Sequence, residues 1–182
     1  MSLIARAPYR IGQLGRALAP WVAARDRALA EAMLAPAQLA AFRLMSPTDQ
    51  RHAVRVARHL LHEGLCDPDL LVAALLHDLG KVDPAALGRV RLLHRVTKVV
   101  LTKVAPGLWW RVSTQTGRGL LRGYYLLRHH PTLGAVWAAR LGVSERACAL
   151  IAAHQDDGTV LQVQEAGFRE LLLRLRDADD HL

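Results

Sequence analysis

The sequence predicts an all-α protein with one helical domain. Apolar residues recur at helical spacing, and helix-start signals in which proline follows serine or aspartate recur along the chain. No sustained apolar/polar alternation occurs, and the nearest hairpin-like dipeptide, Asp157-Gly158, lacks flanking strand sequences. A chain of 182 residues with 52% hydrophobic composition can bury one core. We expect a helical N-terminal extension over residues 1–45 and the domain over residues 46–182.

The first helix of the domain is predicted to begin at the segment Ser46-Pro47-Thr48-Asp49. Serine suits the N-cap, proline the first helical position, and an acid the third. The apolar residues that follow fall on one helical face, and His52 lies one turn before Val56 on that face. The helix is therefore expected to hold His52 next to the core.

The next helix is predicted to start at Asp67-Pro68-Asp69 and to end at Gly80. Its centre, Leu70–Leu76, is an uninterrupted apolar run, so this helix should be largely buried. His77 and Asp78 are then expected in its last turn.

The remaining helices are less regular in sequence. Asp83-Pro84 predicts the start of a long basic helix that Pro106-Gly107 closes, and residues 108–123, with the pair Trp109-Trp110, match no clear element. Helical periodicity returns over residues 120–127. The last helices are expected to run from Pro131 to Gly142, from a Ser144 cap to His154, and from about Gly167 to Asp179.

Cysteine usage and the N-terminus favour a cytoplasmic protein. Cys66 and Cys148 lie far apart and form no motif, so neither a disulfide framework nor a thiolate zinc site is expected. Three arginines and Pro8 interrupt the first 20 residues, which is not typical of a secretion signal. The longest apolar run, Leu70–Leu76, is much shorter than the roughly 20 residues needed to span a bilayer.

Positive charge is concentrated in the middle of the chain. The net charge is +8, and residues 84–144 contain ten lysines and arginines but no aspartate or glutamate. Such a block favours a polyanionic partner, namely nucleotide phosphates, nucleic acid or anionic lipid. A solvated arginine-rich surface is the alternative. Nucleic acid is the least expected partner because no nucleic-acid-binding signature accompanies the charge.

The segment from Leu87 to Trp110 has two interpretations. Its apolar residues form a helical stripe, basic residues lie elsewhere in it, and two tryptophans end it, as in a helix that lies in a membrane interface. More often such a stripe is the core face of a helix, which is the interpretation we favour from sequence. The stripe consists of Val90, Leu93, Val96, Val100, Leu101 and Val104.

His77-Asp78 is the strongest local indication of chemistry. Burying a carboxylate without a positive partner costs several kcal/mol. A divalent ion held by imidazole and carboxylate would remove that cost, and such ligands suit Mn, Fe, Co, Zn or, less well, Mg. An ion pair between Asp78 and Arg51 or Arg55 is the alternative.

The motifs resemble the HD superfamily of metal-dependent phosphohydrolases. Arg51-His52-Ala-Val-Arg-Val-Ala and Leu75-Leu76-His77-Asp78-Leu79-Gly80-Lys81 are similar to its opening elements, and Ala178-Asp179 to its final one. His130-Pro131-Thr132-Leu133-Gly134-Ala135 and Ile151-Ala152-Ala153-His154 resemble elements of the members that hold two metals. The resemblance covers residues 46–180, and the ordered combination is more specific than any single element.

The resemblance implies one or two divalent ions and hydrolysis of a phosphate ester or phosphoanhydride, such as a nucleotide, by a metal-bound hydroxide. Asp78 would bridge the two ions, and Lys81 would contact a substrate phosphate. Bacterial hydrolases of dinucleoside tetraphosphates have a similar ligand order. Enzymes that cleave cyclic dinucleotides carry a Gly-Tyr-Pro after the second histidine block, whereas here Gly158 is followed by Thr159-Val160, which disfavours that substrate class. A degenerate domain that binds membranes or polyanions is the alternative function. The implied ligands are His52, His77, Asp78, His130, His154 and Asp179.

Several of these positions have rivals. His129 competes with His130, and His154 could instead be a polar cap near a helix end. The late carboxylate Asp179 competes with Asp156, Asp157, Asp177 and Asp180. The histidines that match no element, expected on the surface or around the ligands, are His59, His62, His94, His129 and His181. The sequence leaves the oligomeric state open.

Overall fold

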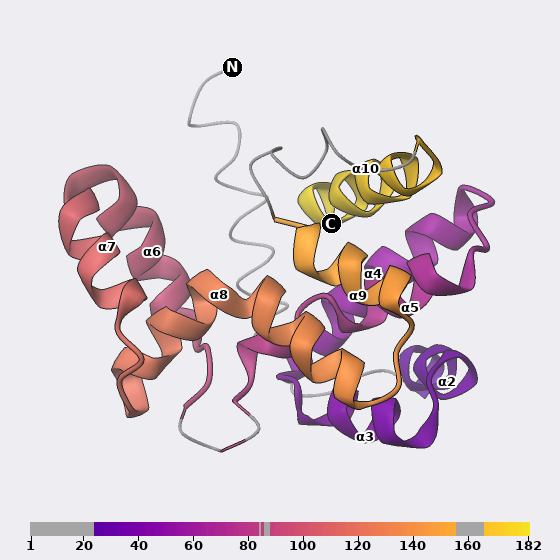
Figure 1. Ribbon diagram of the computed structural model, residues 1–182, viewed down its shortest axis with the longest axis horizontal. Coiled ribbons are helices and arrows are strands. Elements are labelled where there is room, and N and C mark those ends of the chain that lie inside the picture. The colour runs from indigo at the N-terminus through magenta and orange to yellow at the C-terminus, as the bar shows by residue number, and fades with distance from the viewer. Residues whose placement is uncertain (1–23, 84, 86–87, 156–165) are drawn as a thin grey trace.

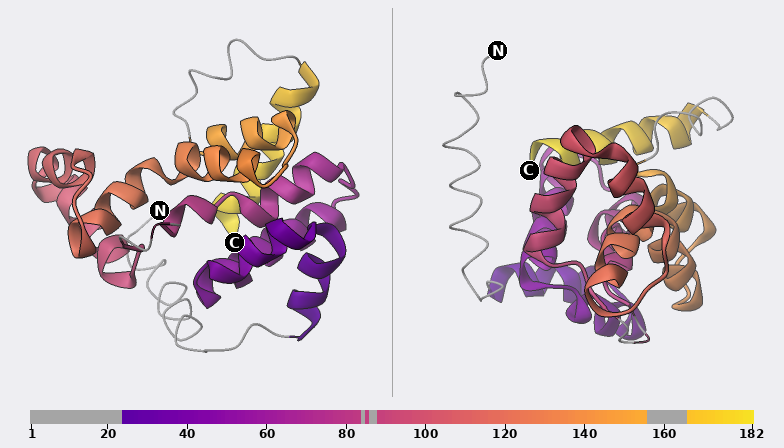
Figure 2. Two further views of the ribbon diagram at one scale, coloured as in Figure 1. Left: turned by 60° about the horizontal axis from the view of Figure 1, so that its bottom comes forward. Right: turned by 90° about the vertical axis from the view of Figure 1, so that its left-hand side faces the viewer.

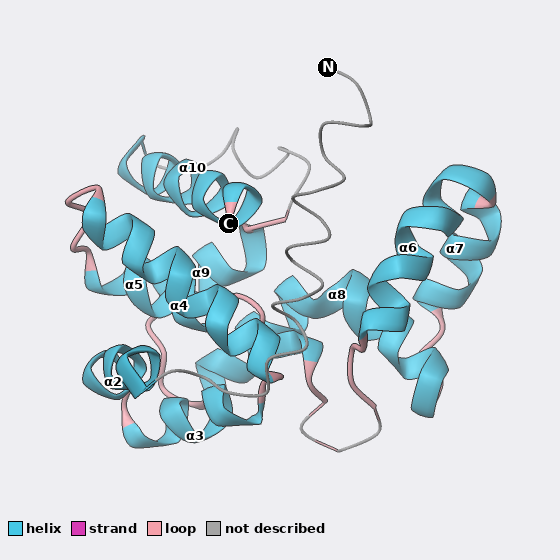
Figure 3. Cartoon of the chain, turned by 180° about the vertical axis from the view of Figure 1, so that it is seen from behind, coloured by secondary structure: helices cyan, strands magenta, loops and turns pink. Residues whose placement is uncertain are grey.

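The protein is all-α, as predicted. The computed structural model describes residues 24–83, 85, 88–155 and 166–182, and these contain nine α-helices, one 3-10 turn and no strand (Figure 3). In chain order they are α2 (Ala24–Met33), α3 (Pro36–Leu44), α4 (Pro47–His62), α5 (Pro68–Leu76), the 3-10 turn η2 (Leu79–Lys81), α6 (Leu92–Val104), α7 (Pro106–Thr114), α8 (Gly119–Arg140), α9 (Glu145–Ala153) and α10 (Ala166–His181).

The helices form a main body and a projecting hairpin. In the body, α5 packs between α4 and α9, α10 lies against α4 and α9, and α2 contacts α4 and α5. The long helix α8 packs on η2 and α9 and extends out of the body to α6 and α7 at one end of the molecule (Figures 1 and 2). We call α6 and α7 together, residues 92–114, the α6–α7 hairpin.

The main core lies where α4, α5, α9 and α10 meet. Leu60, Leu75, Leu150 and Leu172, one from each of these helices, are fully buried. Each such burial stabilises the fold by roughly 1.5–3 kcal/mol. Because these four helices also carry or adjoin five of the six candidate ligands, all but His130 of α8, the core fixes the relative positions of those five.

Three predicted helix starts are confirmed by capping hydrogen bonds. The amide of Asp49 donates to Ser46 Oγ over 3.2 Å, and the amide of Ala147 donates to Ser144 Oγ over 3.1 Å. Asp67 caps α5 in the same way. The predicted end of α5 is too late, because the helix stops at Leu76 and the separate turn η2 contains Gly80.

The predicted start of the basic helix at Asp83-Pro84 is wrong, since α6 begins only at Leu92. Before α6, an isolated antiparallel bridge joins Val82 and Arg89. Arg122 of α8 donates from Nε to the buried Asp83 carboxylate over 2.6 Å. This long-range ion pair ties residue 83 to α8 and holds it outside a helix.

The region after Pro106 is also more helical than predicted. Pro106 begins α7, which includes Trp109-Trp110, and α8 continues through Pro131 instead of starting there. Proline lacks an amide proton, so Pro131 leaves the carbonyl of Leu127 without its usual partner. His130 Nδ1 donates to that carbonyl over 3.1 Å, which compensates within the helix.

The apolar stripe of α6 does not form a core face, contrary to the interpretation favoured from sequence. Val96, Val100 and Val104 are 51%, 52% and 78% exposed. Val90 alone of the stripe is buried, and it precedes the helix. Within the described ranges, no helix combines the length and apolarity needed to cross a bilayer.

Candidate metal centre

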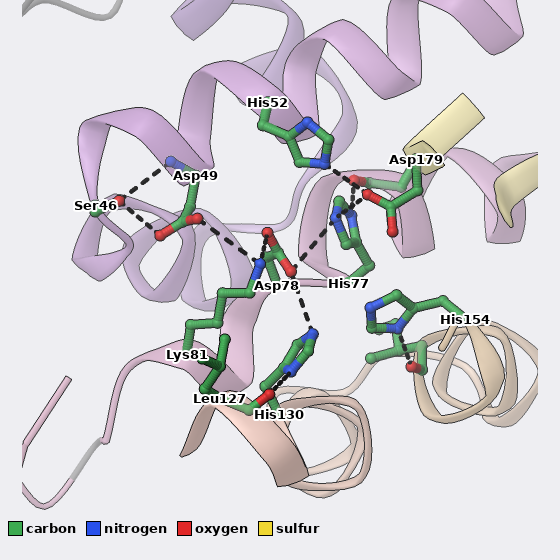
Figure 4. Close-up of polar contacts among 12 residues, drawn as sticks. Ser46, Asp49, His52, His77, Asp78, Lys81, Leu127, His130, His154 and Asp179 are labelled. Carbon is green, nitrogen blue, oxygen red and sulfur yellow. Dashed lines mark hydrogen bonds and ion pairs between the residues drawn. The ribbon is translucent and has the colours of Figure 1, made fainter. Parts of the chain in front are cut away.

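Five helices and their ends bring the six predicted ligands to one place. His52 comes from α4, the pair His77-Asp78 from the end of α5, His130 from α8, His154 from the end of α9 and Asp179 from α10. Figure 4 shows these side chains pointing toward one another. Residues 127 positions apart in sequence, His52 and Asp179, are in direct contact.

The polar atoms of this cluster lie within a few ångströms of one another. Asp78 Oδ1 is 3.5 Å from both His77 Nε2 and His130 Nε2. Asp179 Oδ1 is 2.6 Å from His52 Nε2 and 3.4 Å from His77 Nε2. The His154 ring centroid lies 5.1 Å from the centroids of both His77 and His130, which places His154 between the two halves of the cluster.

Three of the histidines are anchored in the same way. His77 Nδ1 lies 2.8 Å from the Ala74 carbonyl and His154 Nδ1 lies 2.7 Å from the Ile151 carbonyl, and His130 bonds the Leu127 carbonyl as described above. A carbonyl can only accept, so each Nδ1 must carry the proton. In each case the carbonyl belongs to the residue three positions earlier, at a helix end or before a proline, where it has no helical partner.

This anchoring aims each Nε2 at the centre of the cluster. The Nε2 atoms of His77, His130 and His154, and Oδ1 of Asp78, are buried and have no hydrogen-bond partner among the described residues. Each unsatisfied buried polar atom costs about 1–3 kcal/mol. Metal-binding histidines have this arrangement, with one ring nitrogen held by an acceptor and the other free for the ion.

The geometry fits a divalent metal. Three overlapping groups each offer ligand atoms within 4.8 Å of one another. They are His52, His77 and Asp78; His77, His154 and Asp179; and Asp78, His130 and His154. Mixed imidazole and carboxylate ligands suit Mn, Fe, Co or Zn better than Mg. Since Asp78, His77 and His154 each belong to two groups, the cluster has the ligands for one ion and, by sharing them, for two.

The carboxylates are held ionised. Although burial opposes it, Lys81, His77 and His130 lower the pKa of Asp78. Burial also raises the pKa of Asp179, but the hydrogen bond with His52 and the nearby charge of His77 outweigh it, so that the pKa is lowered. The centre therefore presents two anionic carboxylates to a cation.

The histidines divide into two kinds. Burial, together with the charge of Lys81, lowers the pKa of His130, and burial with His77 lowers that of His154 to about 4. At neutral pH both are free bases. Despite burial, Asp78 and Asp179 raise the pKa of His77 to about 9, so His77 carries a proton that a metal would have to displace.

Lys81 and Arg95 form a cationic group beside the cluster, and of these two the sequence indicated only Lys81. Lys81 Nζ contacts Asp78 Oδ2 over 2.6 Å, and its side chain is 11% exposed, so it is not a solvated helix-end charge. The buried Asp49 forms an ion pair with Arg95 of α6. Sequence reasoning missed the roles of Asp49 and Arg95. Both residues are charged, but they are 46 positions apart in sequence, so only the fold shows that they pair.

Most of the rival ligands lie elsewhere. Asp177 is exposed and contacts His181, and Asp180 is exposed, whereas Asp156 and Asp157 fall outside the described residues. Asp78 pairs with Lys81 and not with Arg51 or Arg55. His94 is neither on the surface nor around the ligands. It is fully buried between α6 and α8.

Comparisons with protein-family models, with curated protein sequences and with solved structures found no match. Support for a metal centre therefore comes from the side-chain geometry of the described residues.

Metal affinity is expected to rise with pH. Below pH about 9 a metal must displace the proton of His77, so affinity should fall about tenfold for each unit of decreasing pH. Calorimetric titration of metal-free protein with Mn²⁺ at pH 6.5 and pH 7.5, in two buffers of different ionisation enthalpy, measures both the affinity and the protons released. Equal affinity at the two pH values, without proton release, would contradict the protonation assigned to His77.

Proposed function

We propose that this protein is a metal-dependent phosphohydrolase that cleaves a phosphate ester or phosphoanhydride of a small molecule, such as a nucleotide. The observation that carries the proposal is the convergence of four buried polar atoms, from His77, Asp78, His130 and His154, beside a cationic cavity. None of the four has a hydrogen-bond partner among the described residues. The motif resemblance to the HD superfamily supports the same function.

The side chains of the cluster would bind the ions in two sets. His52, His77 and Asp179 offer one set of ligand atoms, His130 and His154 offer the other, and Asp78 lies between them. Divalent ions supply Lewis acidity, which polarises the phosphoryl group and activates the attacking water. The helix-end carbonyls that fix the imidazole rings orient these ligands before the substrate arrives.

A cavity of about 190 Å³ adjoins the cluster. It is lined by Lys81, Arg95, Lys98, Leu127, His130 and Gln155. Pockets for whole drug-sized ligands have volumes of roughly 300–1,000 Å³. The smaller volume here suits one or two phosphoryl groups, with the rest of a larger substrate outside the cavity.

Lys98 is the cation in this cavity that favours an anionic substrate most directly. Lys81 pairs with Asp78 and Arg95 with Asp49, whereas Lys98 has no carboxylate partner in the part of the chain that the structure describes. Burial, together with the charge of Lys81, lowers the pKa of Lys98. A phosphate oxygen in the cavity would offset this repulsion, so we assign Lys98 to substrate binding and Lys81 to the phosphoryl group undergoing attack.

Turnover should require both a metal and Lys98. Metal-loaded protein is expected to release phosphate or a nucleotide product from at least one member of a panel of nucleoside phosphates and dinucleoside polyphosphates, and chelator-treated protein to release none. On the best substrate, Lys98→Ala should raise KM roughly 10- to 100-fold, because a charge-assisted hydrogen bond contributes about 1.5–3 kcal/mol. Steady-state kinetics with product detection measures both effects.

Lys103→Ala is the matched control, since Lys103 is on the same helix but exposed and outside the cavity. Its KM should equal that of the wild-type protein. Hydrolysis by metal-free protein, or an equal rise in KM for both variants, would refute the assignment. Failure of metal-loaded protein to hydrolyse any phosphate compound in the panel would count against the proposed function itself.

A further inference from the structure

The α6–α7 hairpin exposes an unusual amount of apolar side chain. Among the described residues, all of the strongly exposed large hydrophobic side chains lie between residues 92 and 121 except Leu44, Val136 and Leu173. The exposed set of this region is Leu92, Leu93, Val96, Val99, Val100, Val104, Leu108, Trp110, Leu120 and Leu121. Scattered exposed apolar residues are ordinary, but a concentration of this kind marks an interaction surface.

On the side of α6 that faces α8, the polar side chains have hydrogen-bond partners. His94 accepts from the amide of Arg91 through Nδ1 and donates from Nε2 to the carbonyl of Leu120. Its ring also stacks edge-on against Tyr124, whose hydroxyl bonds Thr97. The hairpin is thus fixed to α8 by specific polar and aromatic contacts. The hairpin lies at one end of the molecule (Figure 2), and the apolar side chains exposed on α6 take no part in these contacts.

The charges near this face are all of one sign. Arg91, Lys103, Arg111 and Arg118 are exposed on or beside the hairpin, and residues 84–144 contain no acid. The exposed Trp110 ring lies under the guanidinium of Arg128, with 4.0 Å from the guanidinium carbon to the ring centroid. Apolar side chains with a tryptophan and flanking lysine or arginine are typical of protein surfaces that enter the interface of an anionic bilayer.

We propose that the α6–α7 hairpin docks the protein onto anionic lipid membranes. The apolar residues of α6 would enter the boundary between headgroups and acyl chains, while exposed lysine and arginine side chains would contact lipid phosphates. The same helix lines the cavity through Arg95 and Lys98, so docking would hold the cavity near the membrane surface. The docking proposal does not depend on the proposed hydrolysis, because no candidate metal ligand lies in the hairpin.

Charge also argues against the other occupants of this face. A second copy docked through the same surface would bring two acid-free, basic surfaces together, which like-charge repulsion opposes. Residues 1–23 contain no aspartate or glutamate either, so they cannot supply a complementary charge. An anionic lipid surface complements both the apolar and the basic features.

The test is co-sedimentation of the metal-free 182-residue chain with vesicles. One set contains phosphatidylcholine alone and the other phosphatidylcholine mixed with phosphatidylserine. The protein is expected to sediment with the anionic vesicles and to be released by high salt. Val96→Asp combined with Val100→Asp should reduce the affinity at least about tenfold, because two charges replace side chains that would enter the lipid.

Val136→Asp combined with Leu173→Asp is the matched control, since these side chains are also about half exposed but lie outside the hairpin. This variant adds the same negative charge and should retain most of the wild-type affinity for the vesicles. Thermal melts establish that both variants fold. Equal loss in both variants would assign the attraction to net charge and overturn the proposal. Failure of the wild-type protein to sediment with anionic vesicles would also overturn the proposal. If the wild-type protein were then found to be a dimer, and the hairpin variant a monomer while the control variant stayed dimeric, the occupant of this face would be a second copy of the chain.

Discussion

Asp78→Asn is expected to lower the proposed phosphohydrolase activity at least about a thousandfold, equivalent to some 4 kcal/mol of transition-state stabilisation. Asp78 is fully buried, its Oδ1 faces His77 and His130, and it is the carboxylate shared by two of the three potential metal groups. The asparagine side chain has the same shape but lacks the negative charge that attracts a cation to both of these ligand groups. The variant should therefore lose metal as well as turnover.

The measurement compares activity and bound metal in Asp78→Asn and Asp177→Asn. Asp177 lies in the same part of the fold but is exposed and contacts His181, so its variant should behave as wild type. A melting curve in chelator separates loss of metal from loss of fold. Retention of both metal and activity by folded Asp78→Asn would refute the proposed role of this carboxylate.

Gly80→Ala is expected to cause the second large effect, this time through packing. A Cβ at residue 80 would lie 2.2 Å from the carbonyl oxygen of His130 and 2.7 Å from the amide nitrogen of Gly134. Both are backbone atoms of α8, so no side-chain rotation can relieve the clash. Overpacking of this kind costs about 1–3 kcal/mol or more. Because η2 follows Asp78 directly, separating it from α8 should also move His130 away from Asp78.

Denaturant unfolding and metal titration of Gly80→Ala measure these two consequences. The control is Gly107→Ala in α7, where an added Cβ would meet no atom within 4 Å. Gly80→Ala should lose stability and metal affinity together, whereas Gly107→Ala should keep both. Wild-type stability and metal affinity in Gly80→Ala would show that α8 does not pack on η2 as described.

Local signals in the sequence predicted the helices that carry most of the candidate site. Ser46, Asp67 and Ser144 cap α4, α5 and α9 through bonds that span only three residues, so short-range patterns are sufficient to find them. The ordered motifs of histidine and aspartate then nominated six residues, and the fold brings all six together.

The errors have both short-range and long-range causes. The sequence pattern predicts a helix start at Pro131, but α8 passes through it, and the neighbouring His130 takes up the freed carbonyl of Leu127. Asp83-Pro84 also predicts a helix start, but Asp83 forms a long-range ion pair with Arg122 of α8, and α6 begins only at Leu92. Similarly, helical periodicity identified the apolar stripe of α6 but could not tell whether a neighbouring helix covers it.

Elemental analysis of the wild-type protein determines whether this cluster of histidines and aspartates holds metal. Protein purified without chelator, or reconstituted with Mn²⁺, Fe²⁺, Co²⁺ or Zn²⁺ and then desalted, should retain one or two equivalents of metal per chain. Two equivalents would match an Asp78 that bridges two ions, and one would match a single ion held by His52, His77, Asp78 and Asp179. No retained metal under any of these conditions would contradict the metal centre and, with it, the proposed phosphohydrolase.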